Sequence, residues 1–509
     1  DRSPSRGLGD VYKRQDFDRL LKEIHKREMR LVLDLVVNHT SDKHPWFEEA
    51  RKSRHNPYYN YYHWWPAEKG EPPLRLSYFD EEGNAWMYNK PTDSYYLHYF
   101  SRKQPDLNWE NPEVRQEIFD MMRFWFDKGI DGFRMDSISL IAKDPSFPLI
   151  DSKKYPDIFS FYAKEPRLHL YLHEMNRQVL SKYDCMSVGE GSAVMVDDVA
   201  KFVDPAREEL NMLYHFDAAR IRNTTLPDNP ESGIDYSLIA LKKMFTEWDK
   251  AVDKGWPSIY LGNHDQPRMV SRFGSDKDEF RALSAKMLIT FLLTMRGTPY
   301  WFAGDEIGMR NIRFDRIEDY NDIDTINRYK KAKAEGKDPQ AVLDEQKETG
   351  RDNARTPFQW DRSPEAGFTA GTPWLKVNPD YTWINVADEE KDPTSILNYF
   401  KKVVSFRKEN PSLIYGSYHL LDAENPQSYT FLRKTGADTY LIMLNFSPKA
   451  AISTPGIDMS NAHVLLDNYG DRSHMAPQKD ITLRPFEAIV FQLNHPVYES
   501  FIDSLDLLE

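Results

Sequence analysis

Three acidic side chains that end apolar segments are the residues of this sequence best placed to do chemistry. Asp136 stands in GIDGFRMDSIS, Glu190 in CMSVGE and Asp265 in PSIYLGNHD. Carboxylates that meet in one pocket can cleave a glycosidic bond, because one protonates the leaving oxygen while another attacks or stabilises the oxocarbenium-like sugar. A helix cap or an ion pair explains each carboxylate equally well by itself, so joint chemistry requires a fold that brings the three together.

The segment around Asp136 has the spacing of a strand that presents charge on one face. Side chains alternate in an extended strand, so Gly132, Arg134 and Asp136 share one side while Phe133 and Met135 share the other. A neighbouring guanidinium favours the ionised carboxylate, which is the form that a nucleophile needs. A structural ion pair would be the favoured explanation if this segment stood alone.

Alternating strands and helices are predicted to position these side chains. Apolar strands are expected at residues 31–39, 132–139, 185–190, 210–216, 257–265 and 297–308, with helices between them. Polar and charged residues gather at the C-terminal ends of these strands, which is where a (β/α)₈ TIM barrel has its active site. Two strands of the eight are not found; we expect them to precede Asp16.

The sequence divides into four predicted regions. Residues 1–15 have no apolar periodicity and are interpreted as a non-native leader, with a helix expected from Asp16. Residues 16–39 and 104–415 are predicted to form the barrel, and residues 40–103 an inserted domain that is rich in Pro and aromatic residues. A polar helical insertion is expected after residue 308. Short alternating segments in residues 416–509 predict a C-terminal antiparallel β-sandwich.

Composition excludes some partners. The net charge is −13 and no basic cluster is found, which argues against a nucleic-acid or anionic-membrane partner. No apolar run could span a bilayer, and the single cysteine, Cys185, excludes an internal disulfide framework. Aromatic residues make up 13% of the chain, and such rings offer flat faces against which a sugar can lie. The location of the protein stays open.

Five short motifs together resemble the α-amylase family of glycoside hydrolases, in particular its oligo-1,6-glucosidase and α-glucosidase group. They occur in the family's order as DLVVNH, QPDLNW, GFRMDS, VGEG and LGNHD. The resemblance covers nearly everything from Asp16 onwards. It implies that Asp136 is the nucleophile, Glu190 the general acid/base and Asp265 a carboxylate that binds sugar hydroxyls, with retention of the α configuration.

The resemblance also implies substrate-binding roles. Arg134 is similar to the arginine that orients the nucleophile, and His39 and His264 are similar to histidines that bond sugar hydroxyls. Arg355 and Phe100 resemble residues that line the glucose pocket, although a domain-tying ion pair for Arg355 and an ordinary core position for Phe100 are equally good explanations. Asp34 is expected to support the site rather than to react, and burial beside other carboxylates is expected to keep Glu190 protonated.

The expected function is hydrolysis of terminal α-linked glucose from short isomaltose- or maltose-type oligosaccharides. Two alternatives stay open: a sucrose isomerase or trehalose-synthase-like transglycosylase, and a catalytically inactive glucosidase-like interaction module. Ser137, which follows the nucleophile, matches neither the valine associated with α-1,6 preference nor the threonine or alanine associated with α-1,4 preference, so the linkage is undecided. Alternation predicts that its side chain points away from the barrel interior.

No cofactor and no metal site are expected in the residues present. The resemblance places a calcium-binding loop, the first two barrel strands and a pocket aspartate upstream of Asp16, and no other run here has the spacing of a calcium loop. We therefore expect a truncated chain whose open barrel is unstable or inactive, because it exposes strand edges and core.

Overall fold

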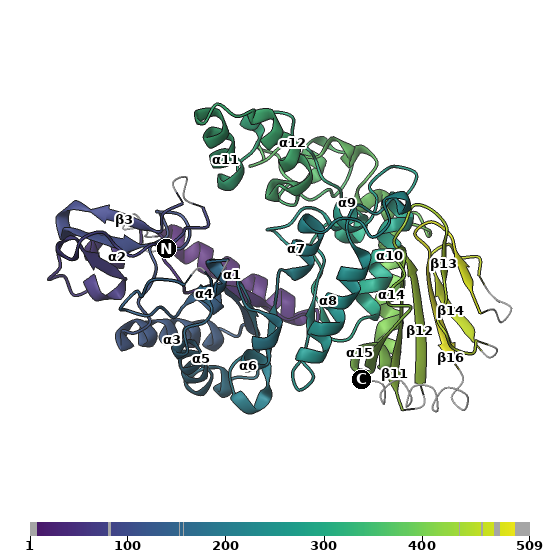
Figure 1. The fold of residues 1–509 in the computed structure, drawn as a ribbon, viewed down its shortest axis with the longest axis horizontal. Coiled ribbons are helices and arrows are strands. Elements are labelled where there is room, and N and C mark those ends of the chain that lie inside the picture. Colours follow the sequence, from purple (N-terminus) through teal and green to yellow (C-terminus); the bar gives the residue numbers. More distant parts are fainter. Residues whose placement is uncertain are drawn as a thin grey trace. The chain divides into compact units, whose positions relative to one another are not determined.

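The chain folds into two compact units in the computed structural model (Figure 1). The structure describes residues 8–79, 83–151, 153–155, 157–436, 438–459, 462–472 and 479–493. The first unit contains Asp1–Phe216 and Ala251–Trp256, and the second contains Asp217–Lys250 and Pro257–Glu509. The division falls inside the residues predicted to form the barrel. The predicted domain boundaries stay predictions.

A four-stranded parallel sheet forms the centre of the first unit. Its strand order is β1-β5-β6-β7, with the strands β1 (Val32–Val36), β5 (Gly132–Asp136), β6 (Met186–Glu190) and β7 (Met212–Tyr214). Helices lie before and between them in sequence: α1 (Leu8–Lys26), α3 (Pro112–Asp127), α4 (Phe159–Tyr162), α5 (Arg167–Gln178) and α6 (Ala200–Val203). Parallel neighbours need such crossover connections. The predicted alternation of strands and helices is confirmed in this unit.

Strand β5 is buried on one face and carries its charges on the other. Phe133 and Met135 are almost completely buried, and Arg134 lies beside Asp34 of β1 and Val188 of β6 in the strand register. The strand begins with Gly132 because a Cβ at this position would lie 2.2 Å from the carbonyl oxygen of Met186. Only glycine allows β5 and β6 to approach this closely.

The inserted segment contains more regular structure than its sequence predicts. Its three short strands, β2 (Trp64–Pro66), β3 (Trp86–Asn89) and β4 (Ser94–Leu97), form an antiparallel sheet in the order β2-β4-β3, and α2 (Pro45–Ala50) precedes them. Aromatic side chains such as Trp86 and Tyr99 pack beneath this sheet with Leu140 and Phe147. Packing of aromatic side chains thus accompanies a sheet whose strands are too short to be recognised in the sequence.

The second unit carries two further parallel strands, β8 (Ser258–Ile259) and β9 (Thr298–Pro299). The long helices α8 (Leu238–Ala251), α10 (Arg281–Thr294) and α14 (Ile396–Glu409) belong to it, and α10 packs against α14. Its other helices are α7 (Asp217–Thr224), α9 (Met269–Phe273), α13 (Val386–Glu389) and α15 (Ser412–Tyr415). The predicted polar insertion contains α11 (Ile323–Ala334) and α12 (Pro339–Thr349).

Antiparallel sheets form the C-terminal part of the second unit, as predicted. The larger sheet has the order β10-β11-β12-β16-β14, and β13 pairs with β15. The strands are β10 (Ser417–Leu421), β11 (Ser428–Thr435), β12 (Asp438–Asn445), β13 (Ala451–Ser453), β14 (His463–Asp467), β15 (Ile481–Leu483) and β16 (Ala488–Leu493). Leu441, Met443, Ile489 and Phe491 are among its fully buried residues. Figure 1 shows these strands beside α10 and α14.

The N-terminal helix differs from its prediction. α1 begins at Leu8, so Asp16 lies within it and does not cap it. Residues 8–15, which we interpret as part of a non-native leader, thus continue into the helix, while residues 1–7 of that leader lie outside the described residues. Within the part of the chain that the structure describes, no helix is long and apolar enough to cross a membrane.

Candidate active site

One guanidinium joins three carboxylates at the C-terminal end of the parallel sheet. Arg134 donates hydrogen bonds through Nη1 to Asp136 at 2.7 Å and to Asp34 at 2.8 Å, and through Nη2 to Glu190 at 2.7 Å. The three acids come from β5, β1 and β6, which are neighbours in the sheet. Two of the three carboxylates predicted for the site, Asp136 and Glu190, are therefore in direct contact with the same arginine.

Tyr214 at the end of β7 completes the coordination of Arg134. Its hydroxyl accepts from Nε at 3.1 Å and also from Nη2. Burial by itself lowers the pKa of the Arg134 guanidinium, but the charges of Glu190 and Tyr214 and the bond to Asp34 outweigh it, so the pKa is raised overall. The arginine is therefore a permanent cation that compensates the carboxylates around it.

Glu190 is the most enclosed of these carboxylates, with 8% of its side chain exposed. Its Oε2 accepts from the backbone N–H of Ser137 at 2.9 Å, and its Oε1 accepts from the Ser192 hydroxyl at 3.1 Å. Burial of Glu190 was expected from the apolar strand before it. The sequence did not reveal that Arg134 bonds Glu190 as well as Asp136, so protonation of Glu190 stays a prediction.

Ser137 departs from the predicted alternation. Strand β5 ends at Asp136, and Ser137 takes a left-handed backbone conformation with φ of 43°. The residue is buried, and its backbone N–H points to Glu190. A left-handed residue directly after a strand redirects the chain, so the rule that placed this side chain on the outer face does not apply here.

His39 follows β1 and lies in a polar and aromatic environment. Its Nε2 lies 3.0 Å from the Gln104 amide nitrogen, and its ring centroid lies 5.2 Å from that of Phe100. Phe100 also stacks on Tyr78 at 5.2 Å. Burial lowers the pKa of His39, and the nearby Asp106 and Asp136 offset only part of this effect. His39 is therefore neutral near pH 7, which suits a group that binds a neutral hydroxyl.

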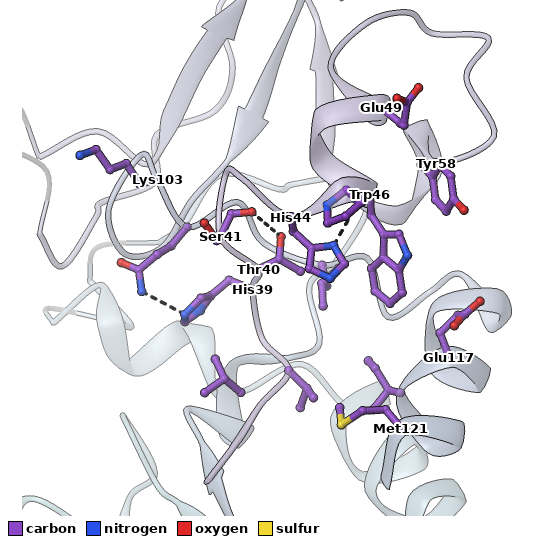
Figure 2. A pocket seen from close by; sticks show the side chains of 16 residues that line it. His39, Thr40, Ser41, His44, Trp46, Glu49, Tyr58, Lys103, Glu117 and Met121 are labelled. Carbon is purple, nitrogen blue, oxygen red and sulfur yellow. Dashed lines mark hydrogen bonds between the residues drawn. The ribbon is translucent and has the colours of Figure 1, made fainter. Parts of the chain in front are cut away.

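A cavity with a volume of about 840 Å³ opens beside His39 (Figure 2). Its lining includes Thr40, Trp46, Tyr58 and Gln104. Asp136 and Glu190 do not line this cavity, which lies on the His39 side of the sheet end. Its size is within the range of small-molecule sites, and its mixture of aromatic and polar side chains is typical of them.

The second unit holds the other predicted residues in a group of their own. Asp265 Oδ1 accepts from Arg355 Nη2 at 2.9 Å and from Arg351 Nη1 at 3.3 Å. Arg355 Nε donates to the His264 carbonyl at 2.8 Å, and the His264 ring lies 3.3 Å from Asp265. Asp265 and His264, in the loop that follows β8, therefore lie together with Arg355.

Asp322 forms the second acidic member of this group. It is almost fully buried and pairs with Arg351, with Arg355 3.6 Å away. Burial tends to lower the pKa of Arg351, but the charges of Asp322 and Asp265 raise it overall. Arg355 is an ion-pair residue within the second unit and contacts the predicted sugar-binding carboxylate directly, so both explanations offered for it retain support.

Sequence reasoning missed several residues of these two groups. Tyr214, Arg351 and Asp322 carry no motif of their own, and only the fold brings them to Arg134 or Asp265. The end of the predicted strand at residues 210–216 was the only available signal for Tyr214. A buried pair formed by Lys143 and Asp106, 3.1 Å apart behind His39, was also missed.

The described residues present no cluster of three or more His, Cys, Asp or Glu side chains that could hold a metal ion. Arg134 already compensates the charge of the acids at the sheet end. These side chains therefore do not fit a calcium site, and the expectation of no metal and no cofactor stays a prediction.

Comparisons with known proteins identify relatives along nearly the whole chain. The family described as Alpha amylase, catalytic domain, matches residues 10–416. An oligo-1,6-glucosidase from Parageobacillus thermoglucosidasius is 48% identical over 94% of this chain and 86% of its own length. An oligo-1,6-glucosidase from Bacillus cereus is 45% identical over the same shares of the two chains.

Solved structures agree with the sequence relatives. A mutant of the isomaltulose synthase from Erwinia rhapontici NX5, crystallised with its natural substrate sucrose, has 40% sequence identity and a TM-score of 0.87. The alignment covers 94% of this chain and 86% of that structure. This match and the family match confirm the predicted fold class, a TIM-barrel catalytic domain followed by an antiparallel C-terminal domain.

Proposed function

Because the chain belongs to the alpha-amylase family of glycoside hydrolases, we propose that it is a retaining α-glucosidase that removes terminal glucose from short α-linked oligosaccharides. The observation that carries the proposal is the bridge from Arg134 to both Asp136 and Glu190. One guanidinium between two carboxyl groups favours the separation of about 5 Å that retaining enzymes use over the roughly 6.5–9.5 Å of inverting enzymes.

Asp136 is the nucleophile in this mechanism. It is 22% exposed and thus open to a ligand, and Arg134 holds one of its oxygens in place. Attack of the carboxylate on the anomeric carbon breaks the glycosidic bond and forms a glucosyl ester with inverted configuration. Arg134 restricts the orientation of the carboxylate before substrate arrives, so less order has to be created in the transition state.

Glu190 is the acid and base. It gives a proton to the departing oxygen in the first step and takes one from water in the second, so the two inversions leave the α configuration. The bonds from Ser137 and Ser192 fix the carboxyl group while its proton moves. Arg134 and Ser137 both donate to Oε2, which leaves Oε1, beside the Ser192 hydroxyl, as the oxygen that can carry the proton.

The remaining predicted residues of each unit carry groups that can bind sugar hydroxyls. His39 is neutral and carries one N–H donor, and Phe100 places an aromatic ring beside it. In the second unit Asp265 offers a carboxylate to sugar hydroxyls, and Arg355 and Arg351 fix its orientation. We propose isomaltose- and maltose-type oligosaccharides as substrates, and the names of the relatives favour isomaltose.

Sucrose isomerisation is the second candidate, because the isomaltulose synthase structure is similar over 94% of this chain. The identity to the oligo-1,6-glucosidases is higher, at 45–48%. The segment FDRIED at residues 314–319 also lacks the arginine-rich character associated with isomerisation. An inactive interaction module is disfavoured, since the paired acids and their arginine are retained in contact.

A side-by-side assay tests the proposal. Maltose, isomaltose and sucrose are each incubated with the purified protein, and all products are separated. Release of glucose from isomaltose or maltose supports hydrolysis. Accumulation of a sucrose isomer would contradict it. Asp136→Asn and Glu190→Gln are expected to lower turnover on the order of a thousandfold in protein that circular dichroism shows to be folded, and unchanged turnover by Asp136→Asn would remove the mechanism.

A further inference from the structure

A buried polar network lies behind His39 and joins Lys143 to two of the sequence motifs, DLVVNH and QPDLNW. Lys143 Nζ donates to Asn38 Oδ1 at 2.6 Å and lies 3.1 Å from Asp106 Oδ2. Asn38 Nδ2 lies 3.4 Å from Asp106 Oδ1 and 3.3 Å from His39 Nδ1. The side chains of Lys143 and Asp106 are completely inaccessible to solvent, as is Asn38. This network therefore connects a buried cation to a ring nitrogen of His39.

The ammonium of Lys143 determines which way the Asn38 amide faces. A lysine ammonium has three donors and no acceptor, so its contact with Asn38 has to be made to the amide oxygen. The amide nitrogen is then on the opposite side, where it meets Asp106 and His39. Turning the amide over would place its NH₂ group 2.6 Å from a buried ammonium and would leave two buried donors without an acceptor.

The ring of His39 faces two amide nitrogens at once. Asn38 Nδ2 lies at its Nδ1 and Gln104 Nε2 lies at its Nε2. Burial lowers the pKa of His39, so the ring is neutral and has one donor and one acceptor. Both amide groups cannot donate to a neutral ring. One of them has to turn, and the choice fixes the position of the ring proton.

Gln104 is the amide that can turn at lower cost. Its oxygen accepts one hydrogen bond, from the Ser101 backbone N–H at 3.2 Å, in a partly exposed position. Turning the Gln104 amide breaks its neutral hydrogen bond from Ser101. Turning the Asn38 amide breaks the buried, charge-assisted hydrogen bond from Lys143. After the turn, Gln104 Oε1 accepts from His39 Nε2. Figure 2 shows the contact at this side of His39.

We propose that Lys143, acting through Asn38, holds His39 in the tautomer that carries its proton on Nε2, so that Nε2–H is presented as a donor. In the free protein the acceptor is Gln104 Oε1, and in the complex it is a hydroxyl oxygen of the sugar. Lys143 is thus a positioning residue that never touches substrate. The role of the sugar hydroxyl rests on the proposed function, but the tautomer itself does not.

Nitrogen NMR on protein labelled with ¹⁵N-histidine measures the tautomer without any substrate. The His39 signals, among those of 14 histidines, are those lost in His39→Gln. His39 is expected in the Nε2–H tautomer in the unchanged chain. Asn38→Asp should convert it to Nδ1–H, because a carboxylate keeps the contact with Lys143 but can only accept from His39. Lys143→Met should give a mixture of both tautomers.

Lys242→Met is the matched control. Lys242 is another fully buried lysine, but it donates to backbone carbonyls, those of Asp422, Asn425 and Ser428 in the second unit. Its replacement should lower the thermal unfolding temperature and leave the His39 signals unchanged. If Lys143→Met does not fold, Asn38→Asp decides the question.

The outcomes separate the inference from the proposed function. An Nδ1–H tautomer in the unchanged chain, or an Nε2–H tautomer that persists in Asn38→Asp, overturns the inference whatever the activity. If the tautomers behave as expected and no α-glucoside is cleaved, the proposed function fails alone. With an active enzyme, Asn38→Asp should lower kcat/KM roughly three- to tenfold through loss of one neutral hydrogen bond to substrate.

Discussion

Replacing Arg134 with lysine is the substitution that the structure predicts most sharply. The change keeps the positive charge but removes the fork that reaches several partners at once. Arg134 bonds Asp34, Asp136, Glu190 and Tyr214 from three nitrogens. A single ammonium at the end of a flexible chain can keep one or two of these partners. We therefore expect Asp136 and Glu190 to lose their common anchor.

The size of the effect follows from the bonds lost. Arg134 donates to Asp136 and to Glu190 at 2.7 Å each. Hydrogen bonds to charged groups contribute roughly 1.5–3 kcal/mol each, so two of them are worth about 3–6 kcal/mol. If the loss falls on the transition state, kcat/KM decreases roughly a hundred- to ten-thousandfold. KM should change less, since the lost contacts position reacting groups and do not bind the sugar.

Arg115→Lys provides a matched control in the same unit. The Arg115 side chain is 17% exposed, as is that of Arg134, and it bonds Glu174 and the Trp109 carbonyl at 2.7 Å each. None of its partners belongs to the predicted site. Its lysine variant should lose comparable thermal stability and keep kcat/KM within about threefold of the unchanged enzyme.

The assay is hydrolysis of p-nitrophenyl α-glucoside and isomaltose by each purified variant, with circular dichroism to confirm folding. A folded Arg134→Lys enzyme that retains more than a tenth of the original kcat/KM would refute the reasoning. An equal loss in Arg115→Lys would also refute it, because the effect would then be general destabilisation.

Three further changes test other parts of the structure. Burial raises the pKa of Asp305 to about 7 from 3.8, so the stability that its protonated form provides is present below pH 4 and lost as the pH rises to 7. Asp305→Asn should remove up to about 4 kcal/mol of this pH dependence of the unfolding free energy, measured with urea. An unchanged dependence of the unfolding free energy on pH would contradict the assignment. Gly132→Ala should lower the unfolding temperature by several degrees in a thermal scan, because the added Cβ would lie 2.2 Å from the Met186 carbonyl oxygen. An unchanged unfolding temperature would contradict this close approach of β5 and β6. Tyr214→Phe should lower kcat/KM about tenfold through loss of the bond to Arg134, and kinetics equal to those of the unchanged enzyme would exclude a role for that hydroxyl.

Alternation within a strand made the centre of the site predictable. The spacing of Arg134 and Asp136 predicted a shared face, and their 2.7 Å contact confirms it. The rule stopped at Ser137, because the strand ends there and the backbone turns left-handed. Alternation predicts the direction of a side chain only within a strand, and no residue type in GFRMDSIS indicates that the strand ends at Asp136.

Contacts between distant segments were beyond the sequence. Lys143 and Asn38 are separated by 105 positions, and Asn38 and Asp106 by 68. Asn38 lies at the end of a predicted strand and Asp106 lies within QPDLNW, but nothing in either motif indicates a contact with Lys143. Only the parallel sheet, which brings the ends of β1 and β5 together, makes a buried pair possible. The network behind His39 was therefore invisible until the fold was known.

The small sheet of the inserted segment could not be predicted from the sequence for a different reason. Its strands are three or four residues long, and one ends in Pro66. Such runs are too short for a clear period of two, and proline argues against a strand interior. Aromatic packing of Trp86 and Tyr99 stabilises the small sheet instead. The sequence predicted an insertion here but not its sheet.

The most direct test of the central claim is to trap the glucosyl-enzyme. Glu190→Gln is mixed with p-nitrophenyl α-glucoside, whose leaving group needs no acid; without a base for the second step, the ester accumulates. Peptide mass spectrometry after proteolysis should then locate one added glucosyl unit on Asp136. A glucosyl unit on any other residue, or full turnover with no covalent intermediate, would contradict the account.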